Sequence, residues 1–466
     1  MFEAREKGGK QEELWLVKRE LCPAPAQGFY QRVDRTLGEM GFAEKVRALC
    51  APAYADQGRG GRPGIDPAVY FKMLLVGFFE DLGSERAIAS RCDDSRSIRA
   101  FLGYELTEAT PDHSSLSVIR QRLGVEIYQK VFEVILAALH AHGLLKGRNL
   151  GIDSSVIEAN AALRSLVSRN DEQSYWDYVR GLAAEAGVDP KDTAAVRNFD
   201  RKRKGRKTSN QDWKNPHDPD SRVGRDKHGA TDLLHKPEHV SDLDTGTIIH
   251  AEVRPGDAGD TVALAPRLAV AAATLQTVID PQHRPDALGA DKGYFKLEEI
   301  ELLQQAGLTT VVSDPIAARR LVDKLEPEQK AVWDRARDAV KSEQGKALLR
   351  RRGMHLERSF AHVLDAGGMR RTTLRGLENL NKRYKIAAAC FNLSQLLRQL
   401  YRVGTPKQWM ASRFWLFWGL LPQIDRRLGP HEPLTVELSP LHRINAFCNR
   451  IGRTFSVPGL HSPAHA

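Results

Sequence analysis

The chain has 466 residues and a formal net charge of +10, from 69 Lys and Arg against 59 Asp and Glu. Its hydrophobic fraction of 41% and charged fraction of 27% are typical of a globular protein and exclude a mostly disordered chain, a collagen and a coiled-coil rod. Apolar runs such as residues 134–139 are far shorter than the roughly 18 residues that cross a bilayer, which excludes a polytopic membrane protein.

The first 15 residues mix acidic and basic side chains and contain no apolar segment of the kind found in secretory signals. We therefore expect a cytoplasmic protein without a membrane partner. Five scattered cysteines form no closely spaced pair, so the pattern favours reduced thiols over a zinc site.

Residues 1–146 are interpreted as an all-helical N-terminal domain. Apolar residues recur at helical spacing between Asp66 and Leu145, and Ser84 stands where a helix N-cap is expected. Short helices that are joined by tight turns and carry several arginines are typical of a DNA-binding helix-turn-helix module. A helical packing domain with solvated arginines shows the same pattern, so both interpretations stay open here.

Residues 147–400 alternate between strand and helix patterns. Apolar, β-rich runs predict strands at 149–159, 286–291 and 308–314, and alternation around a Thr-Gly turn predicts a hairpin of 235–244 and 247–255. Asp260 is expected to cap the helix that follows it. This order predicts an α/β fold, α+β over the whole chain, with a mixed sheet as its core. Residues 401–466 are expected to form a C-terminal helical tail.

A polar insertion at about 160–236 interrupts this core. Its centre, residues 197–227, holds eleven Lys or Arg and five Asp, for a net charge of +6. A charge run is often only a solvated surface, but one this dense is a candidate for contacts with nucleic-acid phosphates.

Three carboxylates stand out by position. Asp153 lies within the first apolar strand, where an unpaired acid is costly. Asp291 follows a strand that exits into a glycine-containing turn, and Glu357 lies beside the apolar stripe of a late helix. Three such acids can hold two Mg²⁺ ions for in-line phosphoryl transfer, although each acid alone is more often a turn former or a solvated side chain.

The order of several segments resembles that of bacterial insertion-sequence transposases of the DDE type. The helical segments at 66–92, 98–104 and 110–123 are similar to the domain that precedes the catalytic core in that family. GIDSSVIEANA, ALGADKGY and LERSFAHV resemble the segments that carry its first Asp, second Asp and Glu. The resemblance covers roughly residues 30–400 and implies a ribonuclease H-like catalytic core.

The resemblance implies Asp153, Asp291 and Glu357 as catalytic residues and metal ligands, and two Mg²⁺ or Mn²⁺ ions as cofactors. It implies an enzyme that cuts DNA at the ends of its element and joins them to target DNA, acts as a homodimer on DNA, and associates with the bacterial nucleoid. The side chains expected to contact DNA are Arg201, Lys202, Arg203, Lys204, Arg206, Lys207, Lys292, Tyr294, Arg358, Arg370, Arg371 and Arg375.

The chain departs from the family pattern at two positions. Leu364 stands where a Lys often follows the Glu by seven residues, and Gly353 stands where an Arg often precedes it by four. Arg350 to Arg352 are candidates to replace that Arg. Two alternatives therefore stay open: a catalytically inactive transposase-derived DNA-binding protein, and a metal-dependent nuclease without strand transfer.

Overall fold

The computed structural model describes residues 27–54, 64–204, 209–226, 229–262, 264–315 and 322–411. The expected C-terminal tail from residue 412 onward, and the predicted DNA contacts Arg206 and Lys207, lie outside these residues. None of the described helices is long and apolar enough to span a membrane.

The N-terminal region is helical, as predicted. Its helices are α1 (Gln27–Glu39), α2 (Phe42–Cys50), α3 (Pro67–Phe79), α4 (Glu85–Asp94), α5 (Arg96–Leu102), α6 (His113–Arg122) and α7 (Val125–Ala141). The Asp66 side chain accepts a hydrogen bond from Ala68 N at the start of α3, and Ser84 accepts one from Ala87 N at the start of α4. These caps satisfy amide groups that the helices leave unpaired, so local sequence determines where both helices begin.

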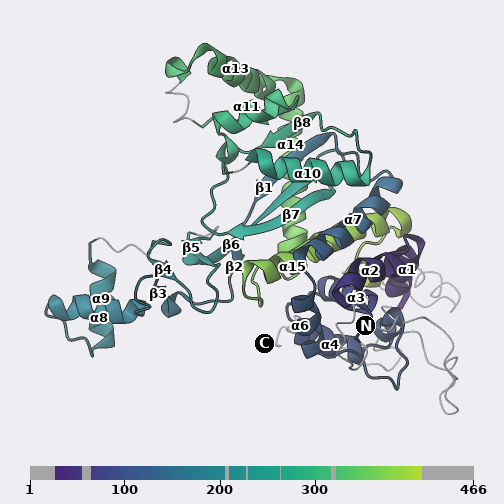
Figure 1. Ribbon diagram of the computed structural model, residues 1–466, viewed down its shortest axis with the longest axis horizontal. Coiled ribbons are helices and arrows are strands. Elements are labelled where there is room, and N and C mark those ends of the chain that lie inside the picture. The colour runs from purple at the N-terminus through teal and green to yellow at the C-terminus, as the bar shows by residue number, and fades with distance from the viewer. Residues whose placement is uncertain are drawn as a thin grey trace, which may run out of the picture. The chain divides into compact units, whose positions relative to one another are not determined.

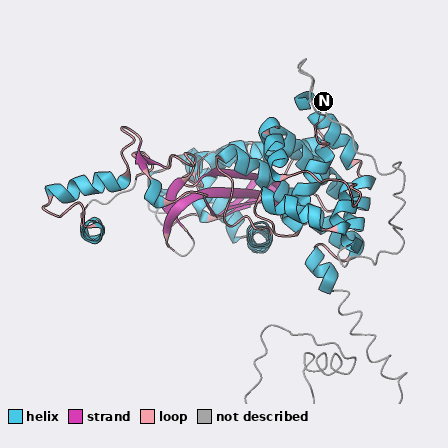
Figure 2. Cartoon of the chain, turned by 90° about the horizontal axis from the view of Figure 1, so that it is seen from below, coloured by secondary structure: helices cyan, strands magenta, loops and turns pink. Residues whose placement is uncertain are grey.

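A mixed sheet follows these helices (Figures 1 and 2). Its main strands are β1 (Asn149–Ser154), β6 (Thr231–Asp242), β7 (Ile248–Pro255), β8 (Ala287–Ala290) and β9 (Thr309–Val312). Their order is β7-β6-β1-β8-β9, with β6 antiparallel to β1 and β7, and with β8 and β9 parallel to β1. The shorter strands β2 (Ile157–Glu158) and β5 (Arg222–Arg225) pair with β6. The predicted α/β class, mixed sheet and hairpin are confirmed.

Helices pack against this sheet. They are α10 (Leu264–Val278), α11 (Leu297–Gln305), α13 (Pro327–Lys341), α14 (Glu343–Phe360), a π-helical continuation (Ala361–Ala366) and α15 (Leu377–Tyr401). Helix α14 packs against β1, β6, β8 and β9. Leu348 of α14 lies over Gly289 of β8, within ordinary van der Waals reach of where a side chain would begin. The short 3₁₀ turns are Ala51–Tyr54, Leu163–Ser165, Lys292–Tyr294 and Val322–Lys324.

Helix α15 closes the open edge of strand β7. The Asn392 amide accepts from Ile248 N at 3.0 Å and donates to Ile248 O at 2.8 Å. The Asn381 amide makes the same two bonds with Val253, each at 2.8 Å. Eleven residues of helix and five residues of strand both span about 16.5 Å, so the two amides match the two positions. A helix thus satisfies backbone groups for which another strand would otherwise be needed.

The insertion is more ordered than its polar sequence indicates. It contains β3 (Val167–Ser168) paired with β4 (Trp213–Lys214), and the helices α8 (Tyr175–Glu185) and α9 (Thr193–Lys202). Tyr175, Val179, Val196 and Trp213 are among the buried residues of an apolar cluster separate from the main core. The polar insertion is therefore a locally folded unit, because a few large aromatic side chains bury enough surface to organise it.

We predict that Asn392→Ala destabilises the protein by about 1–3 kcal/mol, since it leaves both buried polar groups of Ile248 without a partner. Denaturant unfolding measures the change. Gln399→Ala is the matched control, because Gln399 lies on the same helix, is exposed and makes one hydrogen bond, to His142 O. Equal stability of the two variants would contradict the assigned role of the Asn392 amide.

Candidate functional site

The parallel pairing of β1 with β8 brings two of the predicted carboxylates together. Ile152 lies opposite Ala290, so Asp153 and Asp291 follow at the same end of neighbouring strands. Asp153 Oδ1 accepts from Ser154 N at 2.9 Å, and Asp291 Oδ1 accepts from Lys292 N at 2.7 Å. Asp291 thereby caps the 3₁₀ turn after β8. The register of one strand pair therefore sets the spacing of the two acids.

Burial and neighbouring charges shift the pKa of Asp153 in opposite directions. Burial raises its pKa above the ordinary value, the Arg352 guanidinium and the Ser154 amide lower it, and the negative charges of Asp291 and Asp260 raise it again. Like charges gathered this closely disfavour ionisation of one another unless cations compensate them. Hard divalent cations prefer carboxylate oxygens, so the side chains at these strand ends fit such an ion chemically.

Asp260 is the residue of this site that sequence reasoning missed. It does not cap α10, which begins four residues later at Leu264, so that expectation was wrong. Asp260 Oδ1 instead accepts from Ser154 Oγ at 2.9 Å and pairs with Lys236 Nζ at 2.6 Å. No local pattern reveals this contact, because 106 residues separate its partners Ser154 and Asp260.

A buried network on β6 supports this end of the sheet. Glu238 is 1% exposed and pairs with Arg267, whose guanidinium also donates to Asp260 O at 2.7 Å. The Tyr294 hydroxyl donates to Glu238 Oε2 at 3.1 Å. One carboxylate thus links the segment that carries Asp260 to the turn that follows Asp291.

Tyr294 was predicted to contact DNA, and its position does not fit that role. Its side chain is 1% exposed, and burial together with the nearby Glu238 charge raises its pKa. The side chain therefore offers no surface to DNA and acts within the fold. Lys292, two residues earlier, is exposed.

Glu357 lies on α14, on an exposed part of the helix. The adjoining Leu356 is buried, and Ser359 Oγ bonds His239 Nδ1 on β6 at 2.8 Å. The described residues contain no group of three or more His, Cys, Asp or Glu arranged to hold a metal ion. The structure brings two of the three predicted acids to neighbouring strand ends, and Glu357 lies on the helix that packs against both strands.

Two residues lie at or beside the positions where the chain departs from the family pattern. Leu364 is fully buried in the π-helical segment, so a Lys there would lose its hydration. Arg352, next to Gly353, contacts the first acid: its Nη2 lies 2.9 Å from Asp153 Oδ1. The arginine that neighbours the expected position thus pairs with the first of the predicted acids.

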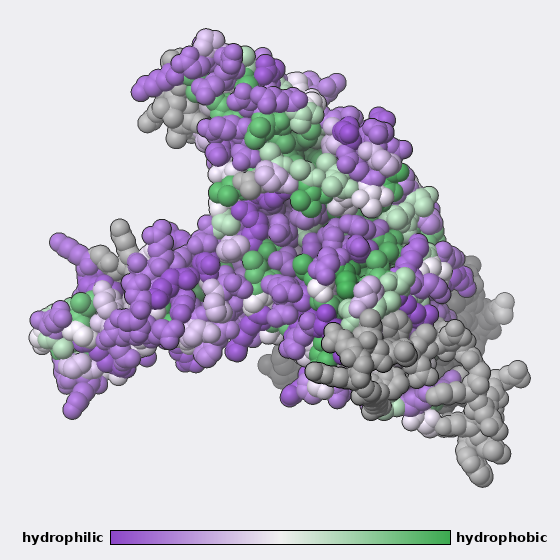
Figure 3. Space-filling view, in the orientation of Figure 1, coloured by the Kyte–Doolittle hydropathy of each residue, from purple (hydrophilic) through white to green (hydrophobic). Residues whose placement is uncertain are grey.

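The remaining predicted DNA contacts differ in exposure. Arg201, Lys202 and Lys204 at the end of α9 are exposed, and the surface over α8 and α9 that Figure 3 shows is largely hydrophilic. Arg203 instead pairs with the buried Asp200 at 2.8 Å, which gives it a role inside the insertion.

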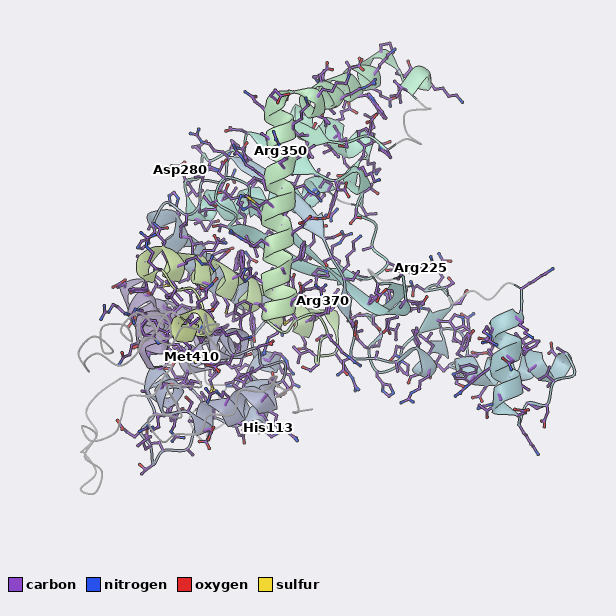
Figure 4. All side chains as sticks on the ribbon, turned by 180° about the vertical axis from the view of Figure 1, so that it is seen from behind. His113, Arg225, Asp280, Arg350, Arg370 and Met410 are labelled. Carbon is purple, nitrogen blue, oxygen red and sulfur yellow. The ribbon has the colours of Figure 1, made fainter. Side chains whose placement is uncertain are left out.

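The other basic group lies at the end of α14 and in the segment that follows it, where Figure 4 labels Arg370. Arg371, Arg375 and Arg358 are exposed. Arg370 is partly buried and pairs with Asp365 at 2.6 Å. Within this group, the exposed arginines are the ones that a DNA backbone can reach directly.

Comparisons with known protein families agree with the resemblance to DDE transposases in two segments of the chain. Residues 20–122 match the family described as a transposase domain (DUF772), and residues 317–397 match the family described as a transposase DDE domain. The second match contains Glu357, whereas Asp153 and Asp291 lie between the two matches. No curated protein and no solved structure matches the chain.

We predict that Asp153→Asn changes the pH dependence of stability in metal-free buffer. The folded state raises the pKa of Asp153, so the stabilisation present below the unfolded value of about 3.9 is lost as pH rises through the folded value. Asparagine does not titrate. The stability of the wild type relative to the variant should therefore fall as pH rises above about 4, as measured by urea unfolding. A constant difference would contradict the raised pKa.

Proposed function

We propose that this chain, an insertion-sequence DDE transposase by its two family matches, cuts DNA at the ends of its element and joins the freed ends to target DNA. The observation that carries the proposal is the meeting of Asp153 and Asp291 at the ends of paired parallel strands. Strand ends of this kind are where open α/β sheets hold their reactive groups.

Asp153 and Asp291 are assigned as ligands of a pair of Mg²⁺ or Mn²⁺ ions. When bound, such ions activate an attacking water or 3′-hydroxyl and stabilise the leaving oxygen. Glu357 is assigned as the third carboxylate because its helix α14 packs against both strands that carry the aspartates. The protein supplies no nucleophile of its own; its side chains hold ions and orient phosphate.

DNA is the proposed partner, with terminal repeats and target DNA as the two substrates. The exposed Arg201, Lys202 and Lys204 are assigned to the DNA backbone, since phosphate contacts by basic side chains supply most of the sequence-independent affinity. The reaction joins two ends, which favours two copies of the chain in the DNA complex. The helical region before the core is assigned to the terminal repeats.

A second candidate is a transposase-derived DNA-binding protein without catalysis. The burial of Leu364, where related enzymes often have a Lys, favours it. It shares the DNA surface with the first candidate and differs in the chemistry, so cleavage separates the two.

We predict that Asp291→Asn, Asp153→Asn and Glu357→Gln each lower DNA cleavage by at least about a hundredfold and leave binding of the element's ends largely intact, because metal ligands contribute several kcal/mol to phosphoryl transfer. The measurement is excision of the natural flanking DNA from a plasmid with the protein supplied in trans. Asp280→Asn is the control, since Asp280 is exposed and lies at the end of α10 (Figure 4).

Retained cleavage in one of these variants would remove that residue from the site. Tight binding of the ends by the wild type without any metal-dependent excision would favour the non-catalytic candidate.

We also predict that replacing Arg201, Lys202 and Lys204 together by Gln weakens DNA binding and makes it less dependent on salt. Each lost phosphate contact should reduce the slope of log affinity against log salt concentration by about 0.9. Arg180→Gln is the control, because Arg180 is an exposed Arg of the same insertion that already pairs with Asp177. An unchanged slope in the triple variant would show that this segment does not contact DNA.

A further inference from the structure

Three consecutive arginines on α14 have three different partners. Arg350 donates to Lys346 O on its own helix, and Arg351 pairs with Asp244 at 2.9 Å. Arg352 pairs with Asp153 at 2.9 Å and donates from Nε to Ile152 O at 3.3 Å. Among these three, Arg352 is the one that contacts a proposed metal ligand. Its side chain is 15% exposed, against 49% for Arg351.

The packing of α14 determines that it is Arg352 which reaches Asp153. Leu348 lies over Gly289 of β8, and Ser359 is bonded to His239, the residue opposite Asp153 in the sheet. Residues 348, 352 and 359 recur at helical spacing and lie on the same face of the helix. Contacts on either side of Arg352 thus direct it to the end of β1, and its pair with Asp153 follows from the packing.

Arg352 compensates the negative charge of Asp153, which is what a metal ion bound to Asp153 would also do. Asp153, Asp260 and Asp291 lie close enough to raise the energy of ionised Asp153. Lys236 compensates Asp260, and Arg352 compensates Asp153. Both Arg352 and Ser154 N contact Asp153 Oδ1. A divalent ion at Asp153 therefore meets a fixed positive charge within a few ångströms.

We propose that Arg352 is the internal counter-ion of the metal-free site, which a divalent cation displaces from Asp153 when it binds. The inference rests on the proposed function, because it takes Asp153 as a metal ligand. Arg352 is a positioning residue in this role: it holds Asp153 in place before the ion arrives and lowers the affinity for the ion. Once displaced, its guanidinium can pair with an anionic group such as phosphate.

The test is Mn²⁺ binding to the full-length protein without DNA at pH 8, measured by the electron paramagnetic resonance signal of free Mn²⁺. Arg352→Gln should bind Mn²⁺ about tenfold more tightly than the wild type, since a unit charge a few ångströms from a divalent ion is removed. Arg351→Gln is the matched control and should bind as the wild type does. Asp153→Asn should lose the site.

Equal or weaker binding by Arg352→Gln, with an Asp153-dependent site present in the wild type, would overturn the counter-ion role and leave the proposed function standing. Absence of any Asp153-dependent Mn²⁺ site in the wild type and in Arg352→Gln would overturn both.

A second measurement covers the case in which Arg352→Gln does not fold. The Nε–Hε nuclear magnetic resonance signal of Arg352 in the wild-type protein, assigned with Arg352→Lys, should shift as Mg²⁺ saturates the site, while that of Arg351 stays in place. Saturation by Mg²⁺ without a shift of the Arg352 signal would show that the pair with Asp153 persists, and would overturn the proposal.

Discussion

The closure of strand β7 by helix α15 is the constraint on which the rest of the structure depends. Asn381 and Asn392 bind both backbone groups of Val253 and Ile248, so the helix runs along the strand at a set position. Helix α15 also packs against α7 and α3 of the N-terminal region. One set of side-chain amides thereby ties the helical region and the sheet into a common apolar core.

The sheet in turn creates the site by its register. A strand pair displaced by one residue would send Asp153 to the other face, so the pairing of Ile152 with Ala290 is what makes two distant acids neighbours. Their shared negative charge requires compensation, and the fold provides it with Lys236 and Arg352 from different elements. The buried Glu238 pairs with Arg267 and accepts a hydrogen bond from Tyr294, and so connects the segments next to Asp260 and Asp291.

The insertion adds a basic surface without disturbing this core. Its own apolar cluster, formed around Tyr175 and Trp213, lets it fold as a local unit between β2 and β6. The exposed basic residues at the end of α9 can therefore contact phosphate while the strands that carry the acids keep their register. Such a division between a rigid sheet and an added binding surface suits a reaction on a large polyanion.

Local sequence determined the helices, the hairpin of β6 and β7, and the strand-end position of Asp291, because periodicity, caps such as Ser84 and turn residues act over a few residues. Tertiary structure alone decided the contacts of Asp260 with Ser154 and of Arg352 with Asp153, and the burial of Tyr294. These depend on strand register and helix packing between segments far apart in the chain. No local pattern encodes which of three adjacent arginines will face a given carboxylate.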